Sequence, residues 1–162
     1  MAYKKKTYKE KLHNNHTSEG DLPRIEKITL KQSKLWGEGT IVIPAPIEVD
    51  TVMKKIPKGK LTTINDIREY LAKKHGATIG CPITTGIFAN IAAHAAEEEE
   101  LEGKKRITPY WRTLKKGGEI NDKYPGGVEA QIKKLEGEGF NVIIKGKKAK
   151  IVDYQKFLAN LD

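Results

Sequence analysis

The chain has 162 residues, a length typical of one domain or of a small domain with an extended arm, and long enough to bury a hydrophobic core. Thirty Lys and Arg against 21 Asp and Glu give a net charge of +9, which favours DNA, RNA or an anionic membrane as partner. A merely soluble basic protein would have the same composition. The single cysteine, Cys81, excludes an intramolecular disulfide, and no Cys/His cluster has the spacing of a zinc site.

Membrane and secretion signals are not found in the sequence. No apolar run approaches the length of a membrane-spanning helix. Residues 1–11 are rich in lysine, but no apolar segment follows them, so they do not form a signal peptide. We therefore expect a cytoplasmic protein without membrane contact.

Residues 1–22 are polar and basic and are expected to form a flexible arm. This arm is either a disordered solubilising tail or a basic segment that lies along phosphates. Its lysines are Lys4, Lys5, Lys6, Lys9 and Lys11. Residues 23–48 form an N-terminal extension, in which the apolar run 39–44, closed by prolines, predicts a strand or an extended segment.

Three helices are predicted in the middle of the chain. Apolar residues at helical spacing predict the first over residues 48–56. The second runs from Thr63 to His75, with Thr63 as its N-cap, Asp66 three residues later, and Gly76 after its end. A turn over residues 77–82 leads into the third helix, residues 83–101.

The third helix is expected to bury one stripe of large apolar side chains. These are Ile83, Ile87, Phe88 and Ile91. Its last turns contain the acidic run 97–100, which opposes the helix macrodipole, so we expect that end to fray.

The C-terminal part mixes extended and helical segments. Residues 106–113 are expected to be extended, 115–127 to form a glycine-rich loop, and 127–139 to form a helix with Val128, Ile132 and Leu135 inward. Residues 141–152 predict a β-hairpin, and a final amphipathic turn follows.

The second and third helices, with their short connection, form a candidate helix-turn-helix. Thr84 and Thr85 at the front of the third helix could donate to phosphates or bases, and the helix N-terminus adds backbone N–H groups. Small residues would let that helix approach DNA closely: Gly86, Ala89, Ala92 and Ala93. The alternative is an ordinary helical hairpin, in which these small residues serve core packing.

Four separated segments resemble the alkylguanine-DNA alkyltransferases, also called methylated-DNA–protein-cysteine methyltransferases. Residues 56–67 resemble the segment that leads into that family's helix-turn-helix. Residues 108–113, Thr-Pro-Tyr-Trp-Arg-Thr, resemble its active-site Pro-Cys-His-Arg strand. Residues 117–127 resemble its glycine-rich loop, and 135–139 resemble its Glu-Gly segment. The resemblance covers residues 49–139 and leaves 1–48 and the C-terminal hairpin and tail, 140–162, unexplained.

The departures from the family concern its chemistry. Tyr110 falls where the family has its nucleophilic cysteine, and a phenol is a far weaker soft nucleophile than a thiolate. Trp111 falls where the family has a histidine, and tryptophan cannot act as a base. Arg112 is retained, Tyr124 matches the pocket-wall tyrosine, and Glu138 matches the glutamate that orients the histidine. The resemblance therefore implies an alkyltransferase-like protein without methyl transfer.

Two positions that handle DNA in the family also differ. The family's tyrosine before the helix-turn-helix corresponds to Ile64, and the arginine that fills the gap left by a flipped nucleotide corresponds to Ile83. An apolar wedge at Ile83 could still intercalate, but Ile83 could equally belong to the core. Cys81 could have a lowered pKa near the helix N-terminus, although a small buried residue in the turn is the commoner case.

The expected fold is mainly α, a winged helix-turn-helix DNA-binding domain with a C-terminal β-hairpin. The expected function is non-catalytic recognition of alkylated DNA in repair. The alternatives are a DNA-binding regulator or nucleoid-type protein without a lesion pocket, and an active alkyltransferase that uses Cys81. The partner is double-stranded DNA, with 6-O-alkylguanine as the implied lesion and a repair protein as a further candidate, and we expect a monomer. No cofactor or metal is implied.

The candidate site residues form two sets. The DNA-binding set is Thr62, Thr63, Thr84, Thr85, Gly86, Ala89, Asn90 and Arg112. The lesion-pocket set is Tyr110, Trp111, Tyr124 and Glu138.

Overall fold

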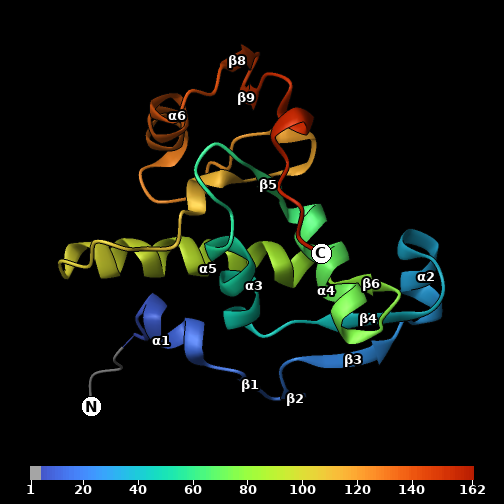
Figure 1. Cartoon of the computed structure of the whole chain (residues 1–162). Helices are drawn as coiled ribbons and strands as arrows, with labels where there is room; N and C mark the ends of the chain where they lie inside the picture. The colour runs from blue at the N-terminus through green and yellow to red at the C-terminus, as the bar shows by residue number, and fades with distance from the viewer. Residues whose placement is uncertain (1–4) are drawn as a thin grey trace.

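Helix α5 (Pro82–Leu101) crosses the centre of the molecule, and the other elements lie around it in the computed structural model, which describes residues 5–162 (Figure 1). Helices α1 (Tyr8–His13), α3 (Pro46–Lys54) and α4 (Ile64–His75) all contact α5. Helix α6 (Gly127–Gly137) and the C-terminal hairpin lie on the far side of α5 from α1 (Figure 1). Helix α5 is therefore the element against which the rest of the chain is organised.

The buried face of α5 is made of small residues, which corrects the expected stripe of isoleucines. The alanines Ala89, Ala92, Ala93, Ala95 and Ala96 are buried, together with Thr85. Ile83 and Ile87 are instead 60% and 49% exposed. Small side chains let α1 and α3 pack closely on α5, and this close packing turns the larger isoleucines outward. Phe88 and Ile91 only pack at the edge of this core.

The predicted helices on either side of this core are confirmed, with shifted boundaries. The first, α3, begins at Pro46, two residues earlier than expected. In α4, the Thr63 side chain accepts a hydrogen bond from the Asp66 backbone N–H, and Gly76 ends the helix in the left-handed conformation. Burial of the Glu48 carboxyl acts to raise its pKa, but hydrogen bonds from the Ala45 N–H, His75 and Lys74 outweigh burial and lower the pKa. These contacts join the start of α3 to the end of α4.

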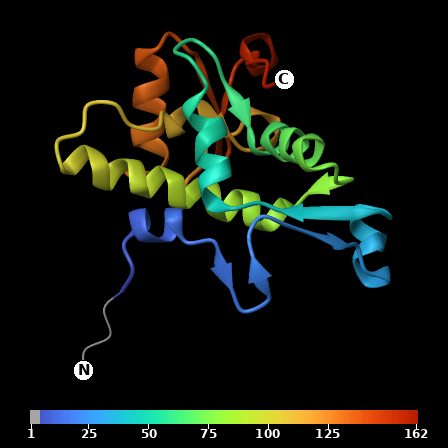
Figure 2. The ribbon, with the colours of Figure 1, turned by 60° about the horizontal axis from the view of Figure 1, so that its bottom comes forward.

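A three-stranded sheet joins the N-terminal extension to the domain. Strand β3 (Arg24–Lys27) pairs antiparallel with β4 (Thr40–Ile43), which pairs in parallel with β6 (Ile79–Gly80). The predicted strand over residues 39–44 is thus confirmed as β4. Helix α2 (Leu30–Trp36) connects β3 to β4 and buries none of its residues. In Figure 2 it lies at the edge of the molecule, beyond the sheet.

The predicted flexible arm is wrong for residues 8–13, which form α1. Leu12 is buried in the same core cluster as Val42 and the alanines of α5. The acidic end of α5, which was expected to fray, is where α1 docks. The Glu98 carboxylate accepts hydrogen bonds from the backbone N–H groups of Tyr8 and Lys9 at 3.1 and 2.9 Å, and the Lys9 ammonium pairs with Glu102 at 2.8 Å. Lys4 of the expected arm lies outside the described residues.

A short hairpin follows α1. Its strands are β1 (His16–Thr17) and β2 (Gly20–Asp21), which pair antiparallel and are exposed.

The C-terminal part has a second core beside α6. Strand β5 (Thr62–Thr63) pairs in parallel with β7 (Thr113–Leu114). Strands β8 (Val142–Lys145) and β9 (Lys148–Ile151) form the predicted hairpin. Short 3-10 helices cover Tyr110–Arg112 (η1), Lys116–Gly118 (η2) and Tyr154–Phe157 (η3). The expectation of an extended stretch over 106–113 is corrected by η1. The core residues are Leu61, Leu114, Ile120, Leu135, Phe140, Ala149 and Ile151.

The fold mixes helices with small sheets, where the sequence predicted a mainly α class, and its C-terminal hairpin is confirmed. Because α1 and β4 supply residues to the core around α5, the N-terminal segments pack on the same core as the resembling region. Among residues 5–162, no helix has the length and apolar character to cross a membrane.

The docking of α1 on α5 gives a stability prediction. We expect Leu12→Ala to lower the free energy of unfolding by about 3 kcal/mol, because it removes a buried side chain and leaves a cavity. The measurement is chemical denaturation of both proteins. The matched control is Leu30→Ala on α2, where the side chain is 86% exposed and the expected change is within about 0.5 kcal/mol. Equal stabilities of the two variants would contradict the docking of α1.

Candidate nucleic-acid interface

The junction between α4 and α5 has a fixed geometry. Cys81 is the N-cap of α5, and its sulfur accepts from the Thr84 backbone N–H at 3.5 Å. Arg68 of α4 donates through Nε to the Gly80 backbone oxygen at 2.9 Å. A Cβ atom at Gly80 would lie 2.6 Å from the Arg68 backbone oxygen, so this close contact between β6 and α4 requires glycine. The N-terminal end of α5 is therefore held at a set angle to α4.

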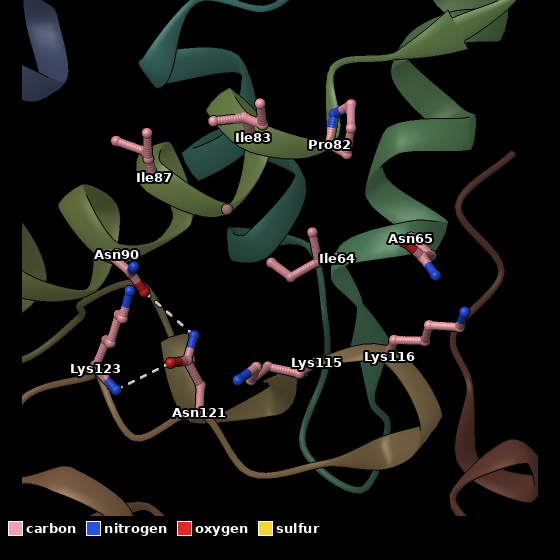
Figure 3. Close-up of a pocket in the computed structure, with 11 residues that line it drawn as sticks. Ile64, Asn65, Pro82, Ile83, Ile87, Asn90, Lys115, Lys116, Asn121 and Lys123 are labelled. Atoms are coloured by element: carbon pink, nitrogen blue, oxygen red, sulfur yellow. Dashed lines mark hydrogen bonds between the residues drawn. The ribbon is translucent and has the colours of Figure 1, made fainter. Parts of the chain in front are cut away.

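A groove of about 410 Å³ lies along the outward face of α5. It is bounded by the start of α4, the first half of α5 and the loop of residues 115–123 (Figure 3). Ile64 lies between α5 and that loop in the close-up. The lining residues are Ile64, Asn65, Pro82, Ile83, Gly86, Ile87, Asn90, Lys115, Lys116, Asn121 and Lys123.

Hydrogen bonds hold the loop against α5. The Asn121 amide donates to Asn90 Oδ1 at 3.2 Å and accepts from the Lys123 backbone N–H at 3.0 Å (Figure 3). The Asn121 backbone N–H donates to Gln131 of α6 at 2.9 Å, and a ring nitrogen of His94 lies 2.9 Å from the Lys123 backbone oxygen. The loop is thus tied to both α5 and α6.

The groove combines an apolar wall with unpaired cations. Ile83 and Ile87 are exposed on α5, and Lys115, Lys116 and Lys123 are exposed on the loop. None of these three lysines takes part in an ion pair within residues 5–162. An apolar surface beside unpaired lysines is suited to nucleic acid, since the lysines can contact phosphates and the apolar side chains can contact bases.

Only part of the predicted DNA-binding set reaches this groove. Gly86 and Asn90 line it, and Thr84 is half-buried nearby. Four other members of the set have buried side chains that do not reach the surface: Thr62, Thr63, Thr85 and Ala89. Thr85 donates to the Cys81 backbone oxygen at 2.6 Å inside the core, so a charge introduced at Thr85 would disrupt the fold rather than test a surface.

Arg112 does not line the groove on α5, and its guanidinium is engaged by groups of the chain itself. Its guanidinium makes a two-pronged ion pair with Glu138, with Nε and Nη2 each 2.9 Å from a carboxylate oxygen. Its Nη1 donates to the Ile56 backbone oxygen at 2.8 Å. This side chain therefore joins η1, the segment after α3, and the end of α6.

The predicted lesion-pocket residues form a packed cluster. Tyr110 and Tyr124 are both buried, with ring centroids 5.5 Å apart in an edge-to-face arrangement. The Tyr124 hydroxyl donates to the Thr113 backbone oxygen at 3.1 Å. The Trp111 indole N–H donates to Glu138 at 2.7 Å, in the position where the resemblance implies a histidine–glutamate pair. None of these four residues lines the groove on α5.

The acid–base properties of this cluster follow from its burial. Burial, with smaller contributions from Glu100 and Glu97, raises the pKa of Tyr110 to about 12. Burial likewise raises the pKa of Tyr124. Burial of Glu138 acts to raise its pKa, but hydrogen bonds from Arg112 and Trp111 outweigh it and lower that pKa. At neutral pH the cluster therefore holds neutral phenols and one paired carboxylate, and it has no strong nucleophile.

Sequence reasoning missed the residues that line the groove from the loop and from the start of α4. These are Asn65, Lys115, Lys116, Asn121 and Lys123. The adjacent lysines in a glycine-rich loop were a signal of a basic edge. Nothing in the sequence indicated that this loop folds back against α5, since the hydrogen bonds that hold it there join residues far apart in the chain.

No known protein-family model matches this chain, and no curated protein sequence matches it either. Its fold is nevertheless that of solved alkyltransferase-like proteins. The chain is similar to S. pombe Atl1 in complex with damaged DNA that contains O6-carboxymethylguanine, with 19% identity and a TM-score of 0.51. It is also similar to S. pombe ATL in complex with DNA, with 20% identity and a TM-score of 0.51. Each comparison covers 71% of this chain and 94% of the other. The resemblance in the sequence motifs is confirmed at the level of the fold.

The raised pKa of Tyr110 predicts a pH dependence of stability. Because folding favours the neutral phenol, its contribution is complete below the unfolded pKa of about 10 and is lost as pH rises towards about 12. The measurement is the free energy of unfolding against pH from 8 to 12 for the wild type and Tyr110→Phe. We expect the difference between the two to change between pH ~10 and ~12 in favour of the phenylalanine variant. A constant difference would show that Tyr110 ionises normally.

Proposed function

We propose that this chain binds double-stranded DNA through the groove on α5 and recognises alkylated bases in DNA repair without transferring the alkyl group. The observation that carries the proposal is the exposed Ile83–Ile87 face of α5 beside three lysines that have no ion-pair partner within residues 5–162. The fold supports it, because both similar structures are complexes with DNA, one of them damaged.

In this proposal α4 and α5 act as a helix-turn-helix, and α5 is the helix that enters a groove of the duplex. Its N-terminal half is uncharged and presents Gly86 and Asn90 beside the two isoleucines. Lys115, Lys116 and Lys123 then contact phosphates on the flanking strand. The hairpin β8–β9 would serve as the wing of a winged helix. Its strand β9 is connected to the lysine loop, because the backbone of Glu119 pairs with both Lys150 of β9 and Lys115 of the loop.

Ile83 is well placed to act as an apolar wedge. It is the most exposed apolar side chain at the front of α5 and lies where the family has a residue that fills the gap left by a flipped nucleotide. Apolar side chains can enter a base step and unstack it. An extruded base would then enter the groove, where the amide NH2 of Asn90 can donate to its edge.

The packed tyrosines favour a second candidate, a DNA-binding protein without a lesion pocket. Tyr110 and Tyr124 fill the region where the resemblance implies a pocket, so a base could reach Tyr110, Trp111, Tyr124 and Glu138 only if the two tyrosines moved. The third candidate, alkyl transfer to Cys81, is disfavoured. That thiol is buried with Ile28 and Ile41 and does not line the groove.

The groove is tested by Ile83→Gln, with Leu101→Gln as the matched control. Both residues are exposed leucine or isoleucine on α5, at its opposite ends, and both changes leave the net charge unaltered. We expect Ile83→Gln to weaken duplex binding about tenfold, or about 1.4 kcal/mol, and Leu101→Gln to leave it unchanged. The measurement is fluorescence anisotropy with duplexes that carry guanine or 6-O-methylguanine.

The same titration separates the candidate functions. Tighter binding of the 6-O-methylguanine duplex supports recognition of alkylated DNA. Equal binding of both duplexes, with Ile83→Gln still weaker, supports the regulator without a lesion pocket. Equal affinities of both variants and the wild type would remove α5 from the interface.

We expect no alkyl group to pass from 6-O-methylguanine to this protein. Tyr110 is a buried neutral phenol and Trp111 cannot accept a proton, so the cluster lacks both the nucleophile and the base. The measurement is incubation with a duplex labelled in its methyl group, then denaturation and counting of label on the protein. Cys81→Ser and Tyr110→Phe serve as controls. Stoichiometric label that either substitution abolishes would establish transfer.

A further inference from the structure

Two open clefts flank Trp111 on a surface that shares no residue with the groove on α5. The first, of about 510 Å³, is lined by Lys54, Lys105, Arg106, Ile107, Pro109, Trp111 and Arg112. The second, of about 610 Å³, is lined by Lys58, Trp111, Ala130, Lys133, Lys134, Gly137 and Glu138. We call the two clefts together the Trp111 surface.

The Trp111 surface is strongly basic. Its unpaired cations, which make no ion pair within residues 5–162, are Lys58, Lys105, Arg106, Lys133 and Lys134. Its one carboxylate, Glu138, is already neutralised by Arg112 and accepts the indole N–H. Lys54 pairs with Asp50 at 3.1 Å but keeps its side chain 54% exposed. The surface is therefore suited to a ligand with several negative charges.

The indole at its centre is held in place. Its N–H is fixed by Glu138 at 2.7 Å, and the Tyr110 ring packs edge-to-face against it at 5.3 Å. The Arg112 guanidinium lies 5.5 Å from the ring centroid, and the Lys134 ammonium lies 4.7 Å from it. Arg112 is locked by its ion pair, whereas Lys134 makes no ion pair within the described residues. Its flexible side chain can move from the ring to a phosphate without breaking another contact.

We propose that the Trp111 surface binds a single strand of nucleic acid, with bases in the clefts beside the indole and phosphates on the five unpaired cations. Proteins that bind single strands combine aromatic side chains, on which bases stack, with a positively charged groove that follows the backbone. A duplex fits this surface less well, because its bases are stacked inside the helix and cannot enter the two clefts that Trp111 lines. The inference goes beyond duplex binding at α5 and does not depend on it.

The test uses the full chain with Trp36→Phe, so that Trp111 is the single tryptophan. Titration with oligothymidylate should quench Trp111 fluorescence. The triple variant Arg106→Ala, Lys133→Ala, Lys134→Ala should weaken binding at least about tenfold and lower the log–log salt slope by about 2, since each phosphate contact on a single strand contributes about 0.7.

The matched control removes three exposed lysines near α2, outside both proposed binding surfaces, and lowers the net charge equally. It is the triple variant Lys27→Ala, Lys31→Ala, Lys34→Ala, and it should bind oligothymidylate as the parent does. Equal weakening in both triple variants would overturn the assignment, because it would show attraction by net charge alone. Circular dichroism and thermal melting confirm that each variant is folded.

Two further arms separate this proposal from duplex binding at α5. Ile83→Gln should leave oligothymidylate binding unchanged, even if duplex binding is lost or never occurs. The proposal is overturned if Ile83→Gln abolishes binding of the single strand, or if an unmodified duplex displaces the single strand completely. Either result would show that the single strand and the duplex share one site. Polyglutamate should displace the strand only weakly. If polyglutamate displaces the strand as effectively as unlabelled oligothymidylate does, and the strand does not quench Trp111 fluorescence, the surface binds acidic protein segments instead.

Discussion

The close packing of α3 and α1 on the alanine face of α5 is the constraint on which the rest of the structure depends. Alanines at positions 89, 92, 93, 95 and 96 are buried and let the helices approach closely. This packing fixes the rotation of α5 about its own axis. Because α5 is rotated in this way, Ile83 and Ile87 lie at the surface and form one wall of the groove.

Local signals in the sequence were sufficient to predict most of the elements. Thr63 as N-cap and Gly76 as C-cap set the ends of α4, and the Lys-Gly-Lys turn placed the hairpin β8–β9. The rotation of α5 could not be predicted, because apolar residues lie on two sides of that helix and periodicity does not choose between them. Helix α1 was missed for a related reason, since its docking depends on Glu98, a residue about ninety positions away.

The candidate site was predictable only in outline. The resemblance located α5 and the Pro109–Arg112 segment, and the absence of a cysteine at Tyr110 was visible in the sequence. Residue identity did not reveal burial or internal pairing, so Thr85 and Arg112 were both assigned to DNA, although the side chains of both make hydrogen bonds within the chain. The lysines of the 115–123 loop reach the groove through tertiary contacts made by Asn121 with α5 and α6, which sequence patterns do not encode.

The acidic run at the end of α5 has a consequence for how the molecule meets a polyanion. A helix of twenty residues is about 30 Å long, so Glu97 to Glu100 lie well away from the lysines beside its first turns. Glu97 and Glu100 make no ion pair within residues 5–162, so their charge stays separated from that of the lysines and gives the molecule a permanent electric moment. In the duplex-binding mode proposed above, the field of the nucleic acid would turn the acidic end away and the front of α5 towards the duplex, and would raise the fraction of productive collisions at low ionic strength.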